Sequence, residues 1–172
     1  MTNLRQYIII QSHFQVKPVY VDESGMNDND FYAYAYSVIG KRYYEAHPGH
    51  YTKRISMIGG LCNKKFMAPF MFEGHCNTAV FEVYVEEVLV PTLKTGMVVV
   101  IDNASFHKST KIKNLIENAR AKLMYLPPYS PDLNPIENYW HKIKTVIRKM
   151  MRDTKMMLDE AMGNVLKEMS NC

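Results

Sequence analysis

The sequence predicts an α/β protein in which helices flank a mixed central sheet. Two adjacent apolar runs, 53–61 and 66–72, precede the clearest helical patterns. A continuous β-branched run at 96–102 and a shorter apolar run at 121–126 then alternate with segments of helical periodicity. Strands first, followed by strands that alternate with helices, are typical of a mixed sheet with helices on its faces.

Five segments are expected to form the strands. Lys17–Asp22 (KPVYVD) is a short buried strand that ends on an acid. Lys53–Leu61 and Phe66–Phe72 are separated only by the polar CNKK, and this pattern predicts an antiparallel hairpin. Gly96–Asp102 (GMVVVID) reads as a central strand with both faces covered. Ala121–Leu126 completes the set as a short strand.

Four further segments are expected to be helices. Asn77–Leu89 carries apolar residues at helical spacing before Pro91, although the alternation in FEVYV keeps a strand open. Lys108–Ala119 is a helix, and a long helix runs from Ile136 to about Met151, after a proline-rich turn at 127–135. A last helix starts near Asp153, with an apolar stripe of Leu158, Ala161, Met162, Val165 and Met169.

Two stretches have unusual composition. Residues 31–44 contain five tyrosines and read as an edge strand and loop, because aromatic residues favour pleated, half-buried surfaces. Six of the 13 methionines lie between positions 150 and 169. Flexible core filler is the simpler interpretation of these methionines, and a partner surface is the alternative.

Composition excludes several classes of protein. The 172 residues are 47% hydrophobic and 22% charged, which is typical of a globular protein, and we expect one domain over 1–172. Three cysteines without CxxC spacing argue against a disulfide framework and a structural zinc site, and favour a reducing compartment. The start has no signal-peptide pattern, and no apolar stretch approaches the roughly 18 residues of a membrane span.

The net charge of +4 is unevenly distributed. Residues 1–100 contain nine Lys or Arg and nine Asp or Glu, whereas residues 141–155 contain six basic residues and one acid. A local basic surface of this kind suits a polyanion such as nucleic acid. On charge alone, a solvated helix face remains the simpler explanation.

Three acids stand where chemistry is expected. Asp22 and Asp102 follow apolar runs, and ligands of α/β sheets bind beyond the carboxyl ends of strands. For either aspartate alone, a turn cap is the simpler explanation. Asn134-Pro135-Ile136-Glu137 reads as a helix start with Asn134 as N-cap and Glu137 at the third position, a sufficient structural reason for the glutamate. Together the three carboxylates could hold two Mg²⁺ ions about 4 Å apart.

Several strings resemble the catalytic core of DDE transposases, in the bacterial insertion-sequence branch of the mariner superfamily. They are VVIDNA at 99–104, HKS at 107–109, LPPYSPDLNPIE at 126–137 and Trp140. The 34 residues between Asp102 and Glu137 match that branch, as do DESG at 22–25 and GKR at 40–42. The resemblance extends from about Lys17 to Lys149.

The resemblance implies an RNase H-like fold with Asp22, Asp102 and Glu137 as catalytic residues and ligands of two Mg²⁺ or Mn²⁺ ions. Hard oxygen ligands agree with that choice of metal. The implied reaction hydrolyses phosphodiesters at the ends of a DNA element and transfers the freed 3′-hydroxyl into target DNA, commonly at TA. The implied partners are double-stranded DNA and further copies of the chain, in the bacterial cytoplasm at the nucleoid.

Other residues have candidate roles beside the triad. His107 could lie near the scissile phosphate or could bond backbone at a helix start, and Asn103 is a possible neighbour of the acids. Glu23 should face away from Asp22, because adjacent strand residues point to opposite faces. Trp140 is expected to pack in the core. The candidate DNA-binding residues are Lys144 and Arg148 on the helix face of Glu137, then Lys142, Lys41 and Arg42.

The chain departs from the family at its start. Only 21 residues precede Asp22, too few for the helix-turn-helix region of full-length members. A separately encoded DNA-binding half, a truncated relic and an artificial boundary remain open explanations. Two alternatives to an active transposase also remain: a decayed DNA-binding or assembly module, and a nuclease of RNA–DNA hybrids. The intact triad speaks against decay, and the proline-rich turn favours the transposase.

Overall fold

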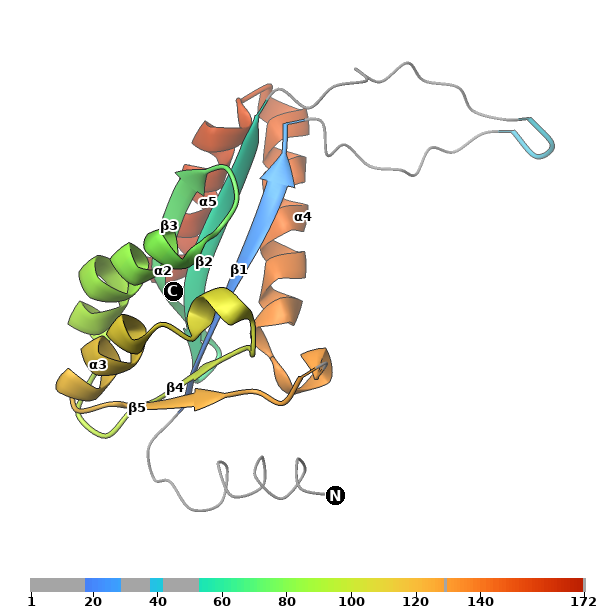
Figure 1. Ribbon diagram of the computed structural model, residues 1–172. Coiled ribbons are helices and arrows are strands. Elements are labelled where there is room, and N and C mark those ends of the chain that lie inside the picture. The colour runs from blue at the N-terminus through green and yellow to red at the C-terminus, as the bar shows by residue number, and fades with distance from the viewer. Residues whose placement is uncertain (1–17, 29–37, 42–52, 129, 172) are drawn as a thin grey trace.

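A five-stranded sheet forms the centre of the protein (Figure 1). The computed structural model describes residues 18–28, 38–41, 53–128 and 130–171. Within the sheet the strand order is β3-β2-β1-β4-β5. The first three strands are antiparallel, and the last two run parallel to β1. The strand bounds are β1 Pro18–Asn27, β2 Arg54–Cys62, β3 Lys65–Glu73, β4 Val98–Ile101 and β5 Lys122–Tyr125. The predicted mixed sheet is therefore confirmed.

Helices cover both faces of this sheet, as predicted. In Figure 1, α2 and α3 lie on one side and α4 and α5 on the other. The helical bounds are α2 Thr78–Tyr84, continued by a π turn η1 (Val85–Leu89) and a 3₁₀ turn η2 (Val90–Thr92), η3 (Ser105–His107), α3 Thr110–Asn118, η4 (Pro131–Leu133), α4 Ile136–Thr154 and α5 Leu158–Asn171. None of the described helices combines the length and the apolar character needed to cross a membrane.

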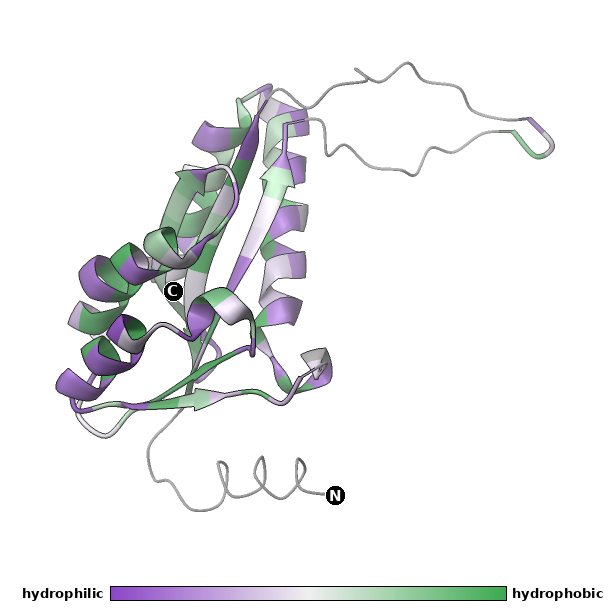
Figure 2. Ribbon diagram, viewed as in Figure 1, coloured by the Kyte–Doolittle hydropathy of each residue, from purple (hydrophilic) through white to green (hydrophobic). Residues whose placement is uncertain are grey.

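Alternating side chains divide the core into two layers. Tyr20 of β1 packs with Ile143 and Ile147 of α4, whereas Val19 and Val21 pack against α2 and α3. β4 divides in the same way, because successive strand residues point to opposite faces. Figure 2 shows the polar sides of the helices turned away from the sheet. We call the side covered by α4 and α5 the α4 face.

The first strand is longer than the sequence indicated. It continues beyond Asp22 to Asn27, because β2 supplies a partner for every residue from Val19 to Asn27. The segment ESGMN contains no β-branched residue and includes a glycine, so no strand pattern marked it. The expectation that Asp22 ends its strand is therefore wrong.

The helix predictions were correct in type and less accurate at the boundaries. Asn77 caps α2 by accepting a hydrogen bond from Val80 N (3.1 Å), so the strand alternative for this segment is wrong. The last helix begins at Leu158 rather than near Asp153, because α4 runs on to Thr154 and ends at Lys155, whose φ is 61°. Met162 of the predicted stripe is fully buried, as expected for core filler, whereas Met157 is 70% exposed. Most of the tyrosine-rich stretch 31–44 lies outside the described residues.

Gly59 of β2 makes room for the ring of Phe66. A Cβ atom at this position would lie 2.4 Å from Phe66 Cζ. Phe66 is buried and makes an edge-to-face contact with Trp140 of α4, with ring centroids 5.4 Å apart. We expect Gly59→Ala to lower the free energy of unfolding in urea by about 1–3 kcal/mol, because the ring cannot move without disturbing the α4 face.

Gly163→Ala in α5 is the matched control for this prediction. Nothing lies within 4 Å of a Cβ at that position, so the substitution should be neutral or should stabilise the helix by up to about 1 kcal/mol. Equal stability of the Gly59→Ala variant and the wild type would mean that Phe66 is not fixed in its place.

Candidate active site

Asp22 and Asp102 lie side by side on neighbouring parallel strands. The last residue pair between β1 and β4 is Tyr20 with Val100. Each aspartate comes two residues after its member of that pair, so both are at the same height and on the α4 face. The parallel pairing thus brings together two carboxylates that are separated by 79 residues in the sequence.

Glu137 reaches the same place from α4. It lies in the first turn of this helix, and all three acids line one cavity of about 390 Å³. The remaining lining comes from the end of β4 and from the proline-rich turn: Asn103, Ala104, Leu126, Pro127, Pro128, Ser130 and Asn134. The structure therefore brings together the three acids that the sequence singled out, together with Asn103.

The start of α4 differs from the predicted capping arrangement. Pro135 occupies the N-cap position, and no side chain makes a capping hydrogen bond there. Asn134 is instead buried in the cavity wall, with its Oδ1 buried and without a hydrogen-bond partner. The capping-box explanation for Glu137 is therefore wrong.

Asp22 is the acid with the most unusual environment. Its burial raises the pKa to about 7, and the negative charges of Glu23, Asp102 and Glu137 add to this effect. The Trp140 indole donates a hydrogen bond from Nε1 to Asp22 Oδ2 (3.2 Å), which fixes the direction of the carboxylate. Trp140 is also 4% exposed, so the prediction that it packs in the core is confirmed. A carboxylate in this position would gain from a nearby cation.

His107 links Asp102 to Glu23. Its Nδ1 lies 2.5 Å from Asp102 Oδ1, and its Nε2 lies 3.3 Å from Glu23 Oε2, an ion-pair distance without the alignment of a full hydrogen bond. The ring is fully buried and contacts Phe81 and Phe106, each with ring centroids 4.2 Å away. The His107 side chain thus contacts the acid cluster, and a place beside the scissile phosphate stays a prediction.

The charges in this group depend on one another. Burial alone disfavours the imidazolium, but the contacts with Asp102 and Glu23 outweigh it and raise the pKa of His107 to about 9. The same hydrogen bond lowers the pKa of Asp102, assisted by the backbone N–H of Ala104 (2.9 Å). Near neutral pH, a buried imidazolium therefore lies between two carboxylates. The Glu23 side chain lies beside this histidine, in agreement with the expected alternation along β1.

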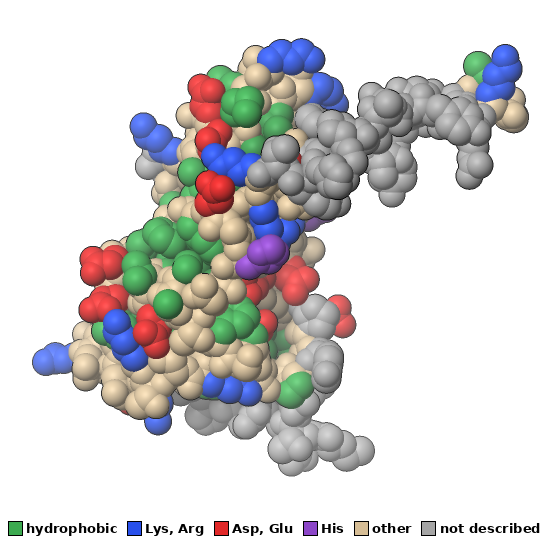
Figure 3. Space-filling view, turned by 45° about the horizontal axis from the view of Figure 1, so that its top comes forward, with side chains coloured by type: hydrophobic (Ala, Val, Ile, Leu, Met, Phe, Trp, Pro, Cys, Tyr) green, Lys and Arg blue, Asp and Glu red, His purple; other side chains and the backbone are tan. Residues whose placement is uncertain are grey.

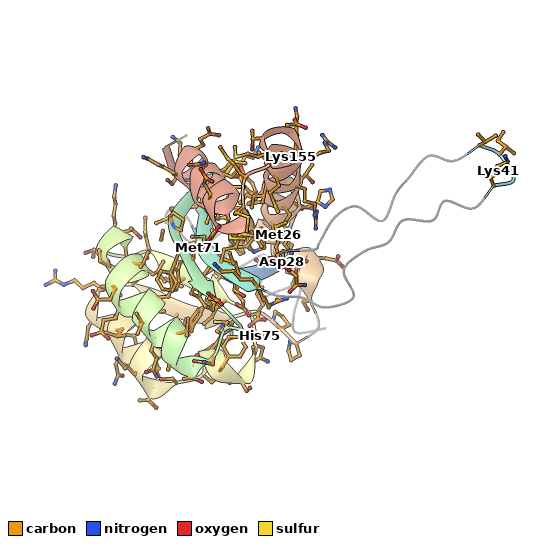
Figure 4. The ribbon with its side chains drawn as sticks, turned by 90° about the horizontal axis from the view of Figure 1, so that it is seen from above. Met26, Asp28, Lys41, Met71, His75 and Lys155 are labelled. Carbon is orange, nitrogen blue, oxygen red and sulfur yellow. The ribbon has the colours of Figure 1, made fainter. Side chains whose placement is uncertain are left out.

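The predicted basic residues are only partly near the cavity. Lys144 lines a second cavity of about 410 Å³ that shares Asp22 and Glu137 with the first. Lys142 lies 5.3 Å from the centre of the Tyr139 ring, and Arg148 is one helical turn beyond Lys144 on α4. Lys41 lies away from the main body in Figure 4, and Arg42 is outside the described residues.

A third cavity contains residues that the sequence did not single out. It has a volume of about 420 Å³ and adjoins the second cavity through Glu23, Ser24 and Lys144. Arg54, His75 and Cys76 also line it, and burial raises the pKa of the Cys76 thiol to about 12, so this thiol stays protonated. These residues come from β2 and the turn after β3, so the pairing of β2 with β1 and with β3 brings them to the site.

The chain matches a known protein family over most of its length. Residues 17–158 match the DDE superfamily endonuclease family. The chain belongs to this family. An 86-residue segment, 49% of the chain, is also 31% identical to the uncharacterized protein y4pE/y4sA of Sinorhizobium fredii (strain NBRC 101917 / NGR234). That segment spans 61% of the relative, so the comparison covers only part of either protein.

Solved structures of a transposase and of an integrase core share this fold. A pre-cleavage Mos1 transpososome and a Mos1 strand transfer complex each give a TM-score of 0.62 over 98% of this chain and 57% of the Mos1 chain, at 13% and 15% identity. The HTLV-2 integrase catalytic core in complex with magnesium gives 0.56 over 86% of this chain and 81% of the integrase chain, at 10% identity. The predicted RNase H-like fold is thus confirmed, and the chain shares it with a chain of the Mos1 transpososome and with an integrase catalytic core.

The residues around the first cavity suit divalent metal ions. Three carboxylates supply only hard oxygen ligands. Burial and, to a smaller extent, the neighbouring negative charges raise the pKa of Asp22, and a cation beside it would favour its charged form. Among the described residues, no group of three His, Cys, Asp or Glu side chains is yet arranged to hold a metal ion.

Proposed function

We propose that this chain is the catalytic domain of a transposase of the mariner superfamily, in its bacterial insertion-sequence branch. It hydrolyses DNA phosphodiesters at the ends of an element and joins the freed 3′-hydroxyl to target DNA. The observation that carries this proposal is the meeting of Asp22, Asp102 and Glu137 around one cavity of a DDE fold. We propose further that residues 1–172 form a single catalytic domain.

Each of the three acids is carried by a different part of the fold. Asp22, Asp102 and Glu137 would hold two Mg²⁺ or Mn²⁺ ions, which supply positive charge to the attacking and leaving oxygens of the phosphodiester. Trp140 directs the Asp22 carboxylate, and His107 directs Asp102. Lys144, on the helix face that follows Glu137, would contact a phosphate beside the cut.

The partners follow from the same proposal. The Mos1 structures with this fold include a paired-end complex with the left transposon end. By analogy, this chain would act as an oligomer on paired DNA ends and on a target containing TA. Lys142, Lys144, Arg148, Lys41 and Arg42 would add salt-sensitive contacts to the DNA backbone.

Nicking of supercoiled plasmid tests the proposed function. The wild type should nick with Mg²⁺ or Mn²⁺ and should not nick in EDTA. Glu137→Gln should abolish nicking while leaving unfolding by urea nearly unchanged, because Glu137 is exposed and caps nothing. DNA binding by a wild type that does not nick would favour the decayed assembly module. Nicking that survives Glu137→Gln would exclude the proposed site.

Metal affinity should depend on pH through Asp22. Because its pKa is about 7 without metal, a proton competes with the cation below that pH. The fraction of ionised Asp22 rises about tenfold from pH 6 to pH 8, so the apparent Kd for Mn²⁺ should fall about tenfold over that range. Calorimetric titration of the DNA-free protein with Mn²⁺ at each pH measures this apparent Kd. Asp22→Asn should bind Mn²⁺ weakly and remove most of this pH dependence.

A further inference from the structure

The third cavity, beside the proposed active site, is lined by basic side chains from three separate elements. Arg54 comes from the start of β2, His75 from the turn before α2, and Lys144 from α4. On the face in Figure 3, a histidine lies directly beside Lys or Arg side chains, and Figure 4 shows His75 on the main body. The carboxylate among the lining residues, Glu23, faces His107. The cavity therefore has the character of an anion site.

Arg54 lies directly against Gly25 in the floor of this cavity. A Cβ on Gly25 would lie 2.4 Å from Nη2 and 2.8 Å from Cζ of Arg54. Glycine weakens a strand interior, and its presence there often marks a close approach by another group. Because Gly25 has no side chain, the guanidinium can pack directly against the backbone of β1.

The hydrogen-bonding capacity of the Arg54 guanidinium is only partly used in this position. Arg54 Nε is buried without a hydrogen-bond partner, and within the described ranges no carboxylate lies at ion-pair distance from Arg54. An unpaired buried donor is costly, and a guanidinium is well shaped to bind two oxygens of a phosphate. The arrangement therefore favours an anion that enters from outside.

The cavity is continuous with the three acids. The first cavity shares Asp22 and Glu137 with the second, and the second shares Glu23, Ser24 and Lys144 with the third. Asp22 and Gly25 are about 10 Å apart along β1 at the rise of a strand. They lie on opposite faces of the strand, so the path passes over the edge of β1 that β4 leaves unpaired beyond Tyr20. At about 3.4 Å of axial rise per nucleotide in one DNA strand, this distance corresponds to two or three phosphates.

We propose that Arg54, which packs against Gly25, binds a backbone phosphate of the DNA strand that is cut at the three acids. His75 and Lys144 add to this phosphate subsite. The proposal rests on the proposed function, because it takes the scissile phosphodiester to lie at Asp22, Asp102 and Glu137. Since the cavities from the acids to this subsite share lining residues, a phosphate of the same strand fits it better than free phosphate does.

Two variants and a matched control test this subsite. Arg54→Gln removes the charge, and Gly25→Ala keeps the charge but displaces the flexible end of the arginine. Arg120→Gln is the control, because Arg120 is exposed at the start of β5, at the opposite end of the parallel strands from the acids. DNA affinity is measured by fluorescence anisotropy in Ca²⁺ at several salt concentrations. Both test variants should lose about tenfold in affinity, and Arg54→Gln should reduce the salt slope by about 1.

Oligonucleotides with one neutral methylphosphonate identify the phosphate itself. In the wild type, neutralising the phosphate two or three nucleotides from the cut should weaken binding as much as Arg54→Gln does. In Arg54→Gln, the same methylphosphonate should cause no further loss, whereas Arg120→Gln should behave as the wild type. If millimolar inorganic phosphate competes in the wild type while every methylphosphonate is neutral, the site binds free phosphate and the proposal is wrong.

Failure of this proposal is distinguishable from failure of the proposed function. If the wild type nicks DNA and Glu137→Gln does not, while Arg54→Gln and Gly25→Ala bind like the wild type, only the phosphate subsite is refuted. A wild type that neither binds nor nicks DNA would overturn both. Thermal unfolding of each variant separates loss of binding from loss of fold.

Discussion

Replacing Asp102 by asparagine is expected to lower metal-dependent nicking about a thousandfold or more while the protein stays folded. The amide oxygen of asparagine can still accept the hydrogen bonds that Asp102 Oδ1 now accepts from Ala104 N and His107 Nδ1. The negative charge that faces the cavity is lost, and a metal ion loses a carboxylate ligand. Single-turnover nicking with Mn²⁺ measures the rate.

Asp132→Asn is the matched control for Asp102→Asn. Asp132 is an exposed acid in the proline-rich turn, and it does not line any of the three cavities described above. Its conversion to asparagine should leave the nicking rate within about twofold of the wild type, since surface changes away from a site have small effects. If Asp102→Asn and Asp132→Asn lowered the rate equally, Asp102 would have no special role.

Replacing His107 by alanine should destabilise the protein by about 3–5 kcal/mol. The fully buried imidazolium lies between Glu23 and Asp102 and contacts two phenylalanine rings. Its removal leaves a cavity and leaves the buried oxygen of Glu23 without its cationic neighbour. Urea unfolding at pH 7 measures the loss, and His75→Ala, at an exposed histidine, should change stability by less than about 0.5 kcal/mol.

The effect of His107→Ala should also depend on pH in a defined direction. The pKa of His107 is raised from 6.5 to about 9 in the folded protein. The stabilisation from its charge is therefore fully present below pH 6.5 and is lost as the pH rises through about 9. The stability difference between wild type and His107→Ala should shrink over that interval. A difference that stays constant from pH 6 to pH 10 would mean that the ion pair contributes nothing.

The fold and the three acids could be predicted because each has a local signal. The run VVVI of β4 marks a strand buried on both faces, and LPPYSPDLNPIE marks the start of α4. The full length of β1 could not be predicted, because its second half is held by β2 and not by its own residue preferences. Long-range pairing overrode local propensity there.

The neighbours of the acids could not be predicted for the same reason. Glu23 and His107 are 84 positions apart, and Gly25 faces Ser56 only because of the register between β1 and β2. Spacing along the chain carries no signal for such contacts. No pattern therefore singled out Arg54, whereas Lys144 is a candidate because it follows Glu137 on one helix face.

The mixed pairing of the sheet also has a consequence for how the protein folds. β2 and β3 are joined by a short hairpin, whereas β1 meets β4 only after a loop of about 70 residues has closed. Closing long loops is slow, so we expect the hairpin to form early and the parallel pairs late. Asp22 and Asp102 therefore meet only in the last stage of folding. In pulse-labelling hydrogen exchange, the amides of β2 and β3 should become protected before those of β4 and β5.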